Sequence, residues 1–342
     1  MSPKGTILIT GLNGYIAGRT AATALKKGYR VRGTVRDPAA GERVKAALCD
    51  LGYSGDDVEV VHVADICEPD AFDQAVIGCL AIVHLAAPIT NIWSMRPTEV
   101  LRVAVDGTQN VLNAAQRAGA QLRSVVLASS TAALFNFPLE SRIYDEKDWN
   151  TTSEQIMSQK GDEADTFNAY LASKTAAEKL FWAFRKEYKP SFSMTSILPS
   201  YVIGAPLIPW KDPNTIPYSN GPYLEAVSTK NAPDDLAVYR DTIDITDVAR
   251  MLLWPIEHTH KADGERFICS SAAADGQAIA DILGKHVPSL GMQGGNENRD
   301  WSVGYPSKTF DSSKALRATS QNWISYEEST IAMALFVKRY LE

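Results

Sequence analysis

The sequence predicts an α/β fold: a doubly wound parallel sheet interleaved with a smaller C-terminal lobe. Short runs rich in β-branched residues alternate with amphipathic helical stretches over the first part of the chain. Several of these runs are apolar through most of their length, as strands buried on both faces of a parallel sheet are. The alternation is lost after Pro199. Such a pattern builds a parallel sheet with helices on both faces and right-handed crossovers.

The elements of the sheet follow one another as strand–helix pairs. Strands are expected at residues 6–10, 30–35, 58–61, 81–85, 125–129 and 194–198. Helices are expected at residues 15–27, 38–51, 69–77, 97–118 and 164–188.

Beyond the sixth strand the pattern becomes irregular. Residues 205–234 are rich in Pro, Asn, Gly, Trp and Tyr and show no clear period, which predicts a long loop over a site. A strand at 241–245, a helix at 246–255 and a strand at 265–269 are expected next. Ser325 and Glu328 form a capping-box pattern, which predicts a helix at the C-terminal end.

Composition excludes several classes of protein. The 342 residues are 45% hydrophobic and carry a net charge of −6 with no Lys/Arg run, so a nucleic-acid partner is not expected. No apolar stretch approaches the ~20 residues that span a bilayer, and no secretory signal is seen. The four cysteines form no CxxC pair, which favours reduced thiols and no metal site. These features predict a cytoplasmic protein.

A glycine-rich turn lies where the first strand leads into the first helix. It has the pattern Gly-x-x-Gly-x-x-Ala from Gly11 to Ala17. Gly11 allows the tight turn, Gly14 lets the backbone approach a pyrophosphate, and the helix N-terminus attracts the anion. A glycine-rich turn without a ligand is the alternative. We expect dinucleotide contacts from Gly11, Asn13, Gly14, Tyr15 and Ile16.

The end of the second strand indicates which dinucleotide is bound. NAD sites place a carboxylate there, whereas here Arg36 precedes the first acid, Asp37. A guanidinium can hold a 2′-phosphate with two hydrogen bonds, so NADPH is the expected cofactor. Arg32 is a second candidate, and two solvated surface arginines are the alternative. Asp65 and Ile66, after the third strand, could contact the adenine or form an ordinary surface turn.

Tyr170 and Lys174 are four residues apart in a predicted helix, so they lie on one face. The motif alone is weak, and its position after the fifth strand makes it informative. That strand ends at Ser129 and Ser130, and the carboxyl ends of parallel strands face the ligand crevice. The pattern predicts a hydroxyl, a phenol and an ammonium at one site.

These motifs together resemble the extended short-chain dehydrogenase/reductase family, near fungal aldehyde and ketone reductases and plant dihydroflavonol reductases. The resemblance runs over nearly the whole chain, and it includes 84–88, 198–204 and 310–314. It implies a Rossmann-type fold with Ser130, Tyr170 and Lys174 as the catalytic residues. It also implies a structural role for His84. Asn113 loosely matches the family position that can carry an asparagine orienting a water or the lysine, and Asn110 is close by. Further cofactor contacts are implied for Leu85, Ala86, Ala87, Pro88, Pro199, Tyr201 and Val202.

The resemblance implies reduction of a carbonyl by hydride transfer from NADPH. Ser130 would polarise the carbonyl and Tyr170 would act as general acid. Lys174 would lower the Tyr170 pKa and hold the nicotinamide ribose. The reverse oxidation of an alcohol or sterol, a sugar-nucleotide epimerase or dehydratase, and an NADP-sensing regulator are the alternatives.

Aromatic residues predict a bulky, apolar carbonyl substrate. Core packing is the alternative role for each of them. The expected organisation is an NADP-binding domain over 1–204 to which 241–270 return, a substrate-binding lobe over 205–240 and 271–324, and a C-terminal helix over 325–342. The protein is expected to be a monomer or a homodimer. The candidate substrate residues are Trp93, Phe135, Trp210 and Tyr223.

Overall fold

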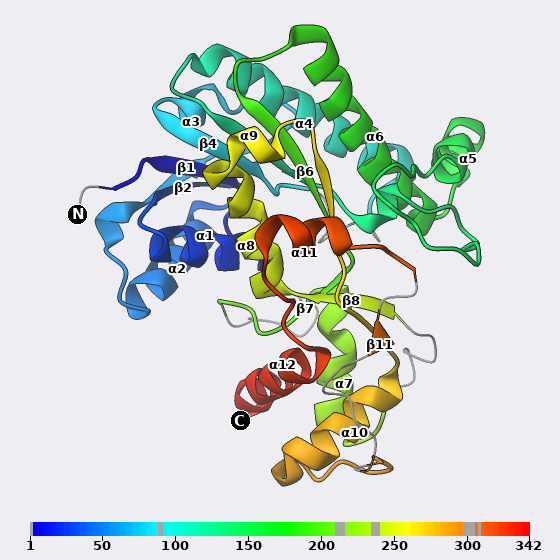
Figure 1. Cartoon of the computed structure of the whole chain (residues 1–342). Helices are drawn as coiled ribbons and strands as arrows, with labels where there is room; N and C mark the ends of the chain where they lie inside the picture. Colours follow the sequence, from blue (N-terminus) through cyan, green and yellow to red (C-terminus); the bar gives the residue numbers. More distant parts are fainter. Residues whose placement is uncertain are drawn as a thin grey trace. The chain divides into compact units, whose positions relative to one another are not determined.

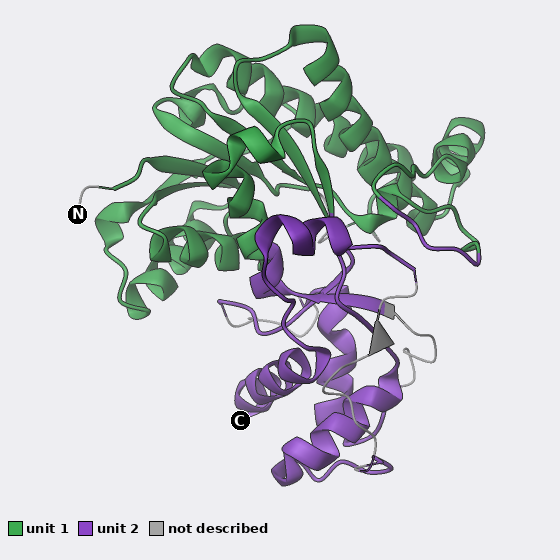
Figure 2. Cartoon of the chain, viewed as in Figure 1, with its two compact units in different colours: residues 1–140, 146–198, 249–267 green, residues 141–145, 199–248, 268–342 purple. Residues whose placement is uncertain are grey.

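The computed structural model describes residues 3–87, 92, 94–208, 216–233, 240–296, 298, 305–306 and 309–342. The chain divides into two compact units, coloured separately in Figure 2. The first consists of Met1–Glu140, Glu146–Leu198 and Ala249–Phe267. The second consists of Ser141–Asp145, Pro199–Val248 and Ile268–Glu342.

A seven-stranded sheet forms the centre of the first unit and confirms the predicted fold class (Figure 1). Its order is β3-β2-β1-β4-β5-β6-β9, and the pairs from β3 to β6 are parallel. This order reverses direction at β1, which creates the crevice where ligands bind in such sheets. The strands are β1 (Thr6–Thr10), β2 (Arg30–Val35), β3 (Val58–His62), β4 (Cys79–His84), β5 (Ser124–Ala128), β6 (Ser193–Pro199) and β9 (Arg266–Cys269).

Helices cover both faces of this sheet, with α1 and α2 on one face and α4 and α6 on the other (Figure 1). A core cluster joins Leu8, Ile82 and Val125 of the strands to Leu112 of α4 and Phe181 of α6. The helices of this unit are α1 (Tyr15–Lys26), α2 (Pro38–Asp50), α3 (Asp73–Val76), α4 (Pro97–Ala118), α5 (Thr152–Lys160), α6 (Thr166–Tyr188) and α9 (Thr259–Ala262); α8 (Ile245–Glu257) begins in the second unit.

Local capping explains where these helices begin. Asp37 accepts a hydrogen bond from the Ala39 N–H before Pro38 opens α2, and Asp165 accepts one from the Asn168 N–H at the start of α6. The helix predicted at 69–77 is reduced to Asp73–Val76, because Asp70 adopts a left-handed backbone angle of 62° that a helix cannot include.

The second unit contains a four-stranded sheet of order β11-β10-β8-β7. Its core cluster draws on three helices and includes Ile203, Tyr223, Ile279 and Met333. Its strands are β7 (Tyr201–Ile203), β8 (Arg240–Asp244), β10 (Ala272–Ala274) and β11 (Tyr305–Pro306). Its helices are α7 (Gly221–Thr229), α10 (Gly276–His286), α11 (Ser313–Thr319) and α12 (Tyr326–Leu341).

Two predictions for this region were wrong in part. The segment 205–234 was expected to be irregular, yet it contains a 3₁₀ turn, Tyr218–Asn220, followed by α7. The Gly-Pro pair at 221–222 reads as a loop signal, whereas Pro in the first turn of a helix is favourable. The strand expected at 241–245 was to return to the first domain, but β8 belongs to the smaller sheet.

The capping box at the C-terminal helix is confirmed. The Ser325 hydroxyl accepts a hydrogen bond from the Glu328 N–H, and the Glu328 carboxylate accepts one from the Ser325 N–H. Buried residues of α12, such as Met333 and Val337, pack in the core of the second unit. Among the described helices, none has the length and apolar character that a membrane crossing requires.

Candidate active site

The glycine-rich turn at the end of β1 is held by backbone contacts. The Leu12 N–H donates to the Thr34 carbonyl at 2.9 Å, and the Gly14 N–H donates to the Gly11 carbonyl at 2.8 Å. Gly11 has a φ of 68°, and a Cβ there would lie 3.2 Å from the Cα of Ala86. Gly11 is therefore required both by the turn and by the close approach of the chain after β4.

The N-terminus of α1 suits an anionic group. Its N-cap is Gly14, which has no side chain to cap the helix, and the first turn, all of it described, contains no acidic residue. Ala17 is buried against the sheet, while Asn13 and Gly14 are exposed. Backbone N–H groups and the helix dipole together favour a phosphate at such a position. The residues present therefore fit the pyrophosphate of a dinucleotide.

His84 is part of the structure that shapes this crevice. The Thr10 Oγ1 accepts hydrogen bonds from the N–H groups of Leu85 at 3.0 Å and Ala86 at 2.9 Å, and it lies 2.9 Å from His84 Nδ1. With both acceptor positions used, the Thr10 hydroxyl donates to Nδ1, which leaves the His84 proton on Nε2. Burial, and then the charge of Lys174, lowers the His84 pKa from 6.5 to about 3. A neutral, structural His84 follows.

The two candidate arginines, Arg32 in β2 and Arg36 directly after it, differ in their surroundings. The Arg32 Nε forms an ion pair with Glu59 at 2.7 Å, and its Nη1 donates to the carbonyls of Ala75 at 3.0 Å and Ile77 at 2.6 Å. These contacts do not support Arg32 as a phosphate ligand, because its donors already hold β3 and the end of α3.

Arg36 remains the candidate for a 2′-phosphate. It follows β2 directly, is exposed, and forms no hydrogen bond or ion pair with any described residue. The first carboxylate after β2, that of Asp37, accepts a hydrogen bond from the Ala39 N–H at 3.0 Å as the cap of α2. The acid nearest the strand end thus has a structural role.

The loop after β3 is fixed from α4. The Asn110 side chain donates to the carbonyls of Ile66 and Glu68, each at 2.9 Å. The Asp65 carboxylate accepts a hydrogen bond from the Cys67 N–H at 2.8 Å. Asn113 accepts from Gln109 at 2.9 Å along the same helix. Asn110 therefore orders the segment predicted to meet the adenine.

Helix α6 brings Tyr170 and Lys174 to one cavity, and Ser130, after the end of β5, lies next to Tyr170. The Lys174 Nζ donates to the carbonyl of Ala128 at 3.5 Å. Tyr170 lies one helical turn earlier, and Ser130 forms a hydrogen bond with it. Ser130 also accepts a hydrogen bond from the Ala132 N–H at 3.1 Å. Ser129 instead donates to the buried carboxylate of Glu178 at 2.7 Å.

Burial is the main influence on the ionisation of the site. It raises the pKa of Tyr170 above its ordinary value of 10.0, and the hydrogen bond with Ser130 opposes this. That Lys174 and the oxidised nicotinamide together lower the Tyr170 pKa in the cofactor complex stays a prediction. Burial lowers the pKa of Lys174 itself from 10.5 to about 8, against the opposing charge of Glu178. Near pH 7 the phenol is protonated and most Lys174 carries its charge.

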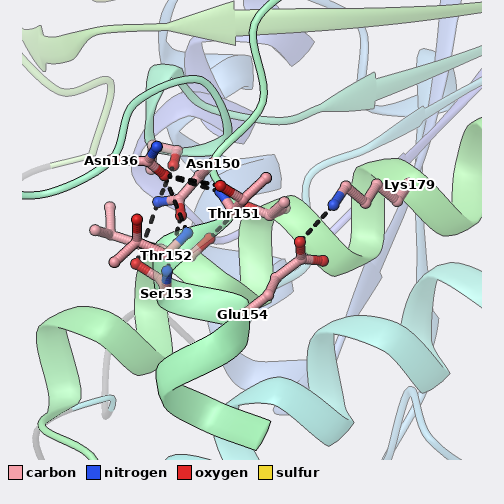
Figure 3. A network of polar contacts seen from close by, with 10 residues as sticks. Asn136, Asn150, Thr151, Thr152, Ser153, Glu154 and Lys179 are labelled. Carbon is pink, nitrogen blue, oxygen red and sulfur yellow. Dashed lines mark hydrogen bonds and ion pairs between the residues drawn. The ribbon is translucent and has the colours of Figure 1, made fainter.

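The segment that follows Ser130 is anchored by a polar network (Figure 3). The Asn136 side-chain oxygen accepts hydrogen bonds from the N–H groups of Thr151 at 2.9 Å and Thr152 at 3.0 Å. The Asn150 N–H donates to the Ala133 carbonyl at 2.8 Å, and its side chain donates to Ser153 at 3.2 Å. These amides fix the 3₁₀ turn after Ser130 to the start of α5.

The cavity is mainly apolar on the sides away from Tyr170 and Lys174. Val100, Ala104 and Thr108 line it from α4, at intervals of four residues. These positions could not be identified from the sequence, because periodicity indicates that α4 is amphipathic but not which ligand its face meets. The other lining residues are His84, Ala86, Ala87, Ile92, Leu127, Ala128, Ser129, Tyr170, Ser173, Lys174 and Ala177.

The candidate substrate residues are less well supported. Tyr223 was predicted to line the substrate site, but it is 1% exposed and packs in the core of the second unit; this prediction was wrong. Phe135 is partly buried, two residues beyond the 3₁₀ turn Thr131–Ala133. Pro88, Trp93 and Trp210 lie outside the described residues.

The three predicted cofactor contacts after β6 can be placed within their own unit. Pro199 ends β6, and Tyr201 and Val202 form β7, which pairs with β8. The Tyr201 hydroxyl donates to the carbonyl of Tyr218 at 3.4 Å.

Comparison with known proteins identifies a family and several relatives. Residues 7–269 match the NAD dependent epimerase/dehydratase family. The chain is 30% identical to tetraketide alpha-pyrone reductase 1 of Arabidopsis thaliana over 289 residues, 84% of this chain and 82% of that protein. It is 34% identical to aldehyde reductase 2 of Sporidiobolus salmonicolor over 206 residues, 59% of each chain.

A solved structure covers almost the whole chain. It is that of yeast methylglyoxal/isovaleraldehyde reductase in complex with NADPH, with a TM-score of 0.80 and 25% sequence identity. The alignment covers 98% of this chain and 99% of that one.

Proposed function

Because this chain belongs to the NAD dependent epimerase/dehydratase family, an extended short-chain dehydrogenase/reductase family, we propose that it reduces an aldehyde or ketone to an alcohol with NADPH. A relative that is 34% identical is named as an aldehyde reductase, and a solved structure that is 25% identical is that of a methylglyoxal/isovaleraldehyde reductase. The alcohol product forms when a hydride and a proton are added to the two ends of the carbonyl bond.

The proposal rests on the grouping of the three predicted catalytic residues beside the glycine-rich turn. Ser130 and Tyr170 share a hydrogen bond, and Tyr170 and Lys174 line one cavity. That cavity is also lined by Ala86, which approaches Gly11 of the turn. A hydroxyl, a phenol and an ammonium thus gather beside the segment that suits a dinucleotide. Two hydroxyl donors are what a carbonyl oxygen requires as it gains negative charge.

The residues have separate roles in the proposed reaction. NADPH, when bound, supplies the hydride that reaches the carbonyl carbon. Ser130 and Tyr170 donate hydrogen bonds to the carbonyl oxygen, and Tyr170 then transfers its proton to that oxygen. The raised pKa of Tyr170 keeps the phenol protonated before the reaction. Reduction starts from this protonated form, whereas alcohol oxidation would start from the deprotonated one.

Lys174 is suited to restore the proton. An ammonium with a pKa of about 8 is a stronger acid than a phenol whose pKa is above 10, so proton transfer from Lys174 to the phenolate is downhill. Lys174 would also hold the cofactor ribose. The proposed cofactor contacts are the turn Gly11–Ile16 and, at the 2′-phosphate, Arg36.

The walls of the cavity support an uncharged substrate. Val100 and Ala104 on α4, Leu127 on β5 and Ala177 on α6 present apolar surface, and the lining described contains no arginine. Desolvating a charged group beside such walls would be costly. We therefore infer an apolar aldehyde or ketone as substrate, rather than a sugar nucleotide or a phosphorylated compound.

The experiment is NADPH oxidation by the purified protein, followed by absorbance. The panel includes an aliphatic aldehyde, a 2-oxoaldehyde, an aryl ketone and, as the competing class, a UDP-sugar. We expect carbonyl-dependent oxidation with at least one apolar compound and none with the UDP-sugar. NADPH binding without oxidation by any carbonyl would overturn the proposal.

A further inference from the structure

We propose that Glu178 is a positioning residue of this site, which keeps Lys174 charged and fixes the end of β5 through Ser129. The inference rests on the proposed function, since Lys174 is the proton source there. Glu178 does not line the cavity, so it would act only through these two neighbours.

The spacing along α6 places Glu178 in line with the catalytic pair. Residues 170, 174 and 178 are four apart and therefore follow one face of the helix. The last residue of β5 and the two that follow it meet this face in turn. The Ala128 carbonyl accepts from Lys174, Ser129 donates to Glu178, and Ser130 contacts Tyr170. Residues 128–130 thus contact the side chains of Lys174, Glu178 and Tyr170.

Glu178 is completely buried, with an exposure of 0%, and its carboxylate is saturated with donors. The Arg266 Nε and Nη2 donate to it at 2.8 and 3.1 Å, which makes a two-point ion pair. Ser129 and Ser196 donate from the two adjacent strands, at 2.7 and 2.5 Å. Trp182 donates at 3.3 Å from the next turn of α6. Such a network holds the carboxylate in one position and surrounds it with hydrogen-bond donors.

Arg266 extends the network to the segment before α5. Its Nη1 donates to the carbonyls of Glu146 at 2.6 Å and Asp148 at 2.8 Å. Its guanidinium lies 3.8 Å from the ring centre of Trp149. The guanidinium of Arg266 therefore contacts two carbonyls and a ring besides Glu178, while the negative charge of Glu178 lies one helical turn from Lys174.

Among the described residues that line the cavity, few other charges face Lys174. His84 on β4 is neutral, and Tyr170 on α6 is protonated near pH 7. Helix α4 contributes only Val100, Ala104 and Thr108, and β5 contributes Leu127, Ala128 and the adjoining Ser129. The charge of Glu178 raises the pKa of Lys174, against the burial that lowers it to about 8. Among the described residues, it is the carboxylate that holds this ammonium in its charged form.

The test measures the titration of Lys174 directly, so it does not depend on catalysis. The protein is labelled with ¹³C-lysine, and the Cε signal of Lys174 is assigned by its loss in Lys174→Arg. In Glu178→Gln the midpoint should fall by about one pH unit or more, since an opposite charge nearby typically shifts a pKa by that amount. Glu187→Gln, the same change at an exposed position of α6, should leave the midpoint unchanged.

Glu178→Gln leaves the charge of Arg266 buried without the opposing charge of the carboxylate, which could unfold the protein. A second variant is therefore needed. Glu178→Gln combined with Arg266→Gln removes both charges, and we expect the lowered midpoint to persist. A folded single or double variant whose Lys174 titrates as in the wild type would overturn the inference.

Activity adds a readout that separates this inference from the proposed function. The alkaline limit of kcat should move to lower pH in Glu178→Gln, while KM for NADPH stays within about twofold. Ser129→Ala keeps the charge and should lower kcat several-fold without moving that limit. A wild type without carbonyl reductase activity would refute the proposed function and leave the NMR result to decide on Glu178.

Discussion

The hydroxyl of Ser129 donates a 2.7 Å hydrogen bond to the carboxylate of Glu178, and this contact assigns different roles to two adjacent serines. Ser129 is 5% exposed and belongs to the hydrogen-bond network around Glu178, whereas Ser130 contacts Tyr170. Ser130→Ala should therefore lower kcat by about a hundredfold or more, the usual effect of removing one donor to a developing oxyanion. Ser129→Ala should lower it only several-fold. Steady-state kinetics compares them, and equal losses would contradict this assignment.

Cofactor preference tests Arg32 of β2 and Arg36, which follows this strand. Arg36→Ala should reduce kcat/KM for NADPH at least tenfold and leave that for NADH nearly unchanged, because a charge-assisted contact to the 2′-phosphate is lost. Arg32→Gln is the matched control. It breaks the contacts to Glu59, Ala75 and Ile77, so it should lower the melting temperature without changing the NADPH/NADH ratio. A wild type that uses both cofactors equally would refute the role of Arg36.

His84 should make stability depend on pH on the acid side. Its pKa is about 3 when folded and 6.5 when unfolded. Below pH 6.5 the unfolded chain binds a proton that the folded protein excludes, so His84's contribution is complete above pH 6.5 and is lost towards pH 3. A slope of about 1.4 kcal/mol per pH unit follows for this range. Urea unfolding between pH 6 and 4.5 should show a smaller slope in His84→Gln; an identical slope would refute the assignment.

Tyr223 should affect folding rather than substrate binding. Its ring is buried in the second unit, where its hydroxyl forms a hydrogen bond with Tyr326. Tyr223→Phe should cost about 1 kcal/mol of unfolding free energy, the typical net value of such a bond. KM for the carbonyl should stay within about twofold. A large rise in KM without loss of stability would restore Tyr223 to the substrate site.

The sheet and the catalytic pair could be predicted because both depend on local spacing. Buried strands such as β1 and β4 show as apolar runs, and a four-residue interval fixes Tyr170 and Lys174 on one helix face. Helix α7 was missed because its first turn is Gly-Pro, although Tyr223, Ala226 and Val227 have helical spacing.

Other features depend on contacts between distant parts of the chain. The different roles of Arg32 and Arg36 could not be predicted without knowing that Arg32 forms an ion pair with Glu59 on the neighbouring strand β3. The raised pKa of Tyr170 follows from burial, which no local pattern reveals. The ion pair of Glu178 with Arg266 joins residues 88 positions apart and has no signature in the sequence.

The central claim is that the phenol of Tyr170 donates the proton in a carbonyl reduction, and Tyr170→Phe tests it most directly. The substitution removes one oxygen and keeps the ring that packs with Ala169 and Ala172. NADPH titration by fluorescence and steady-state oxidation of NADPH with an apolar aldehyde are measured on the same preparation. We expect a dissociation constant within about threefold of the wild type and a kcat lower by at least a hundredfold, as loss of a general acid predicts. Unchanged NADPH binding together with near-normal turnover would contradict the account.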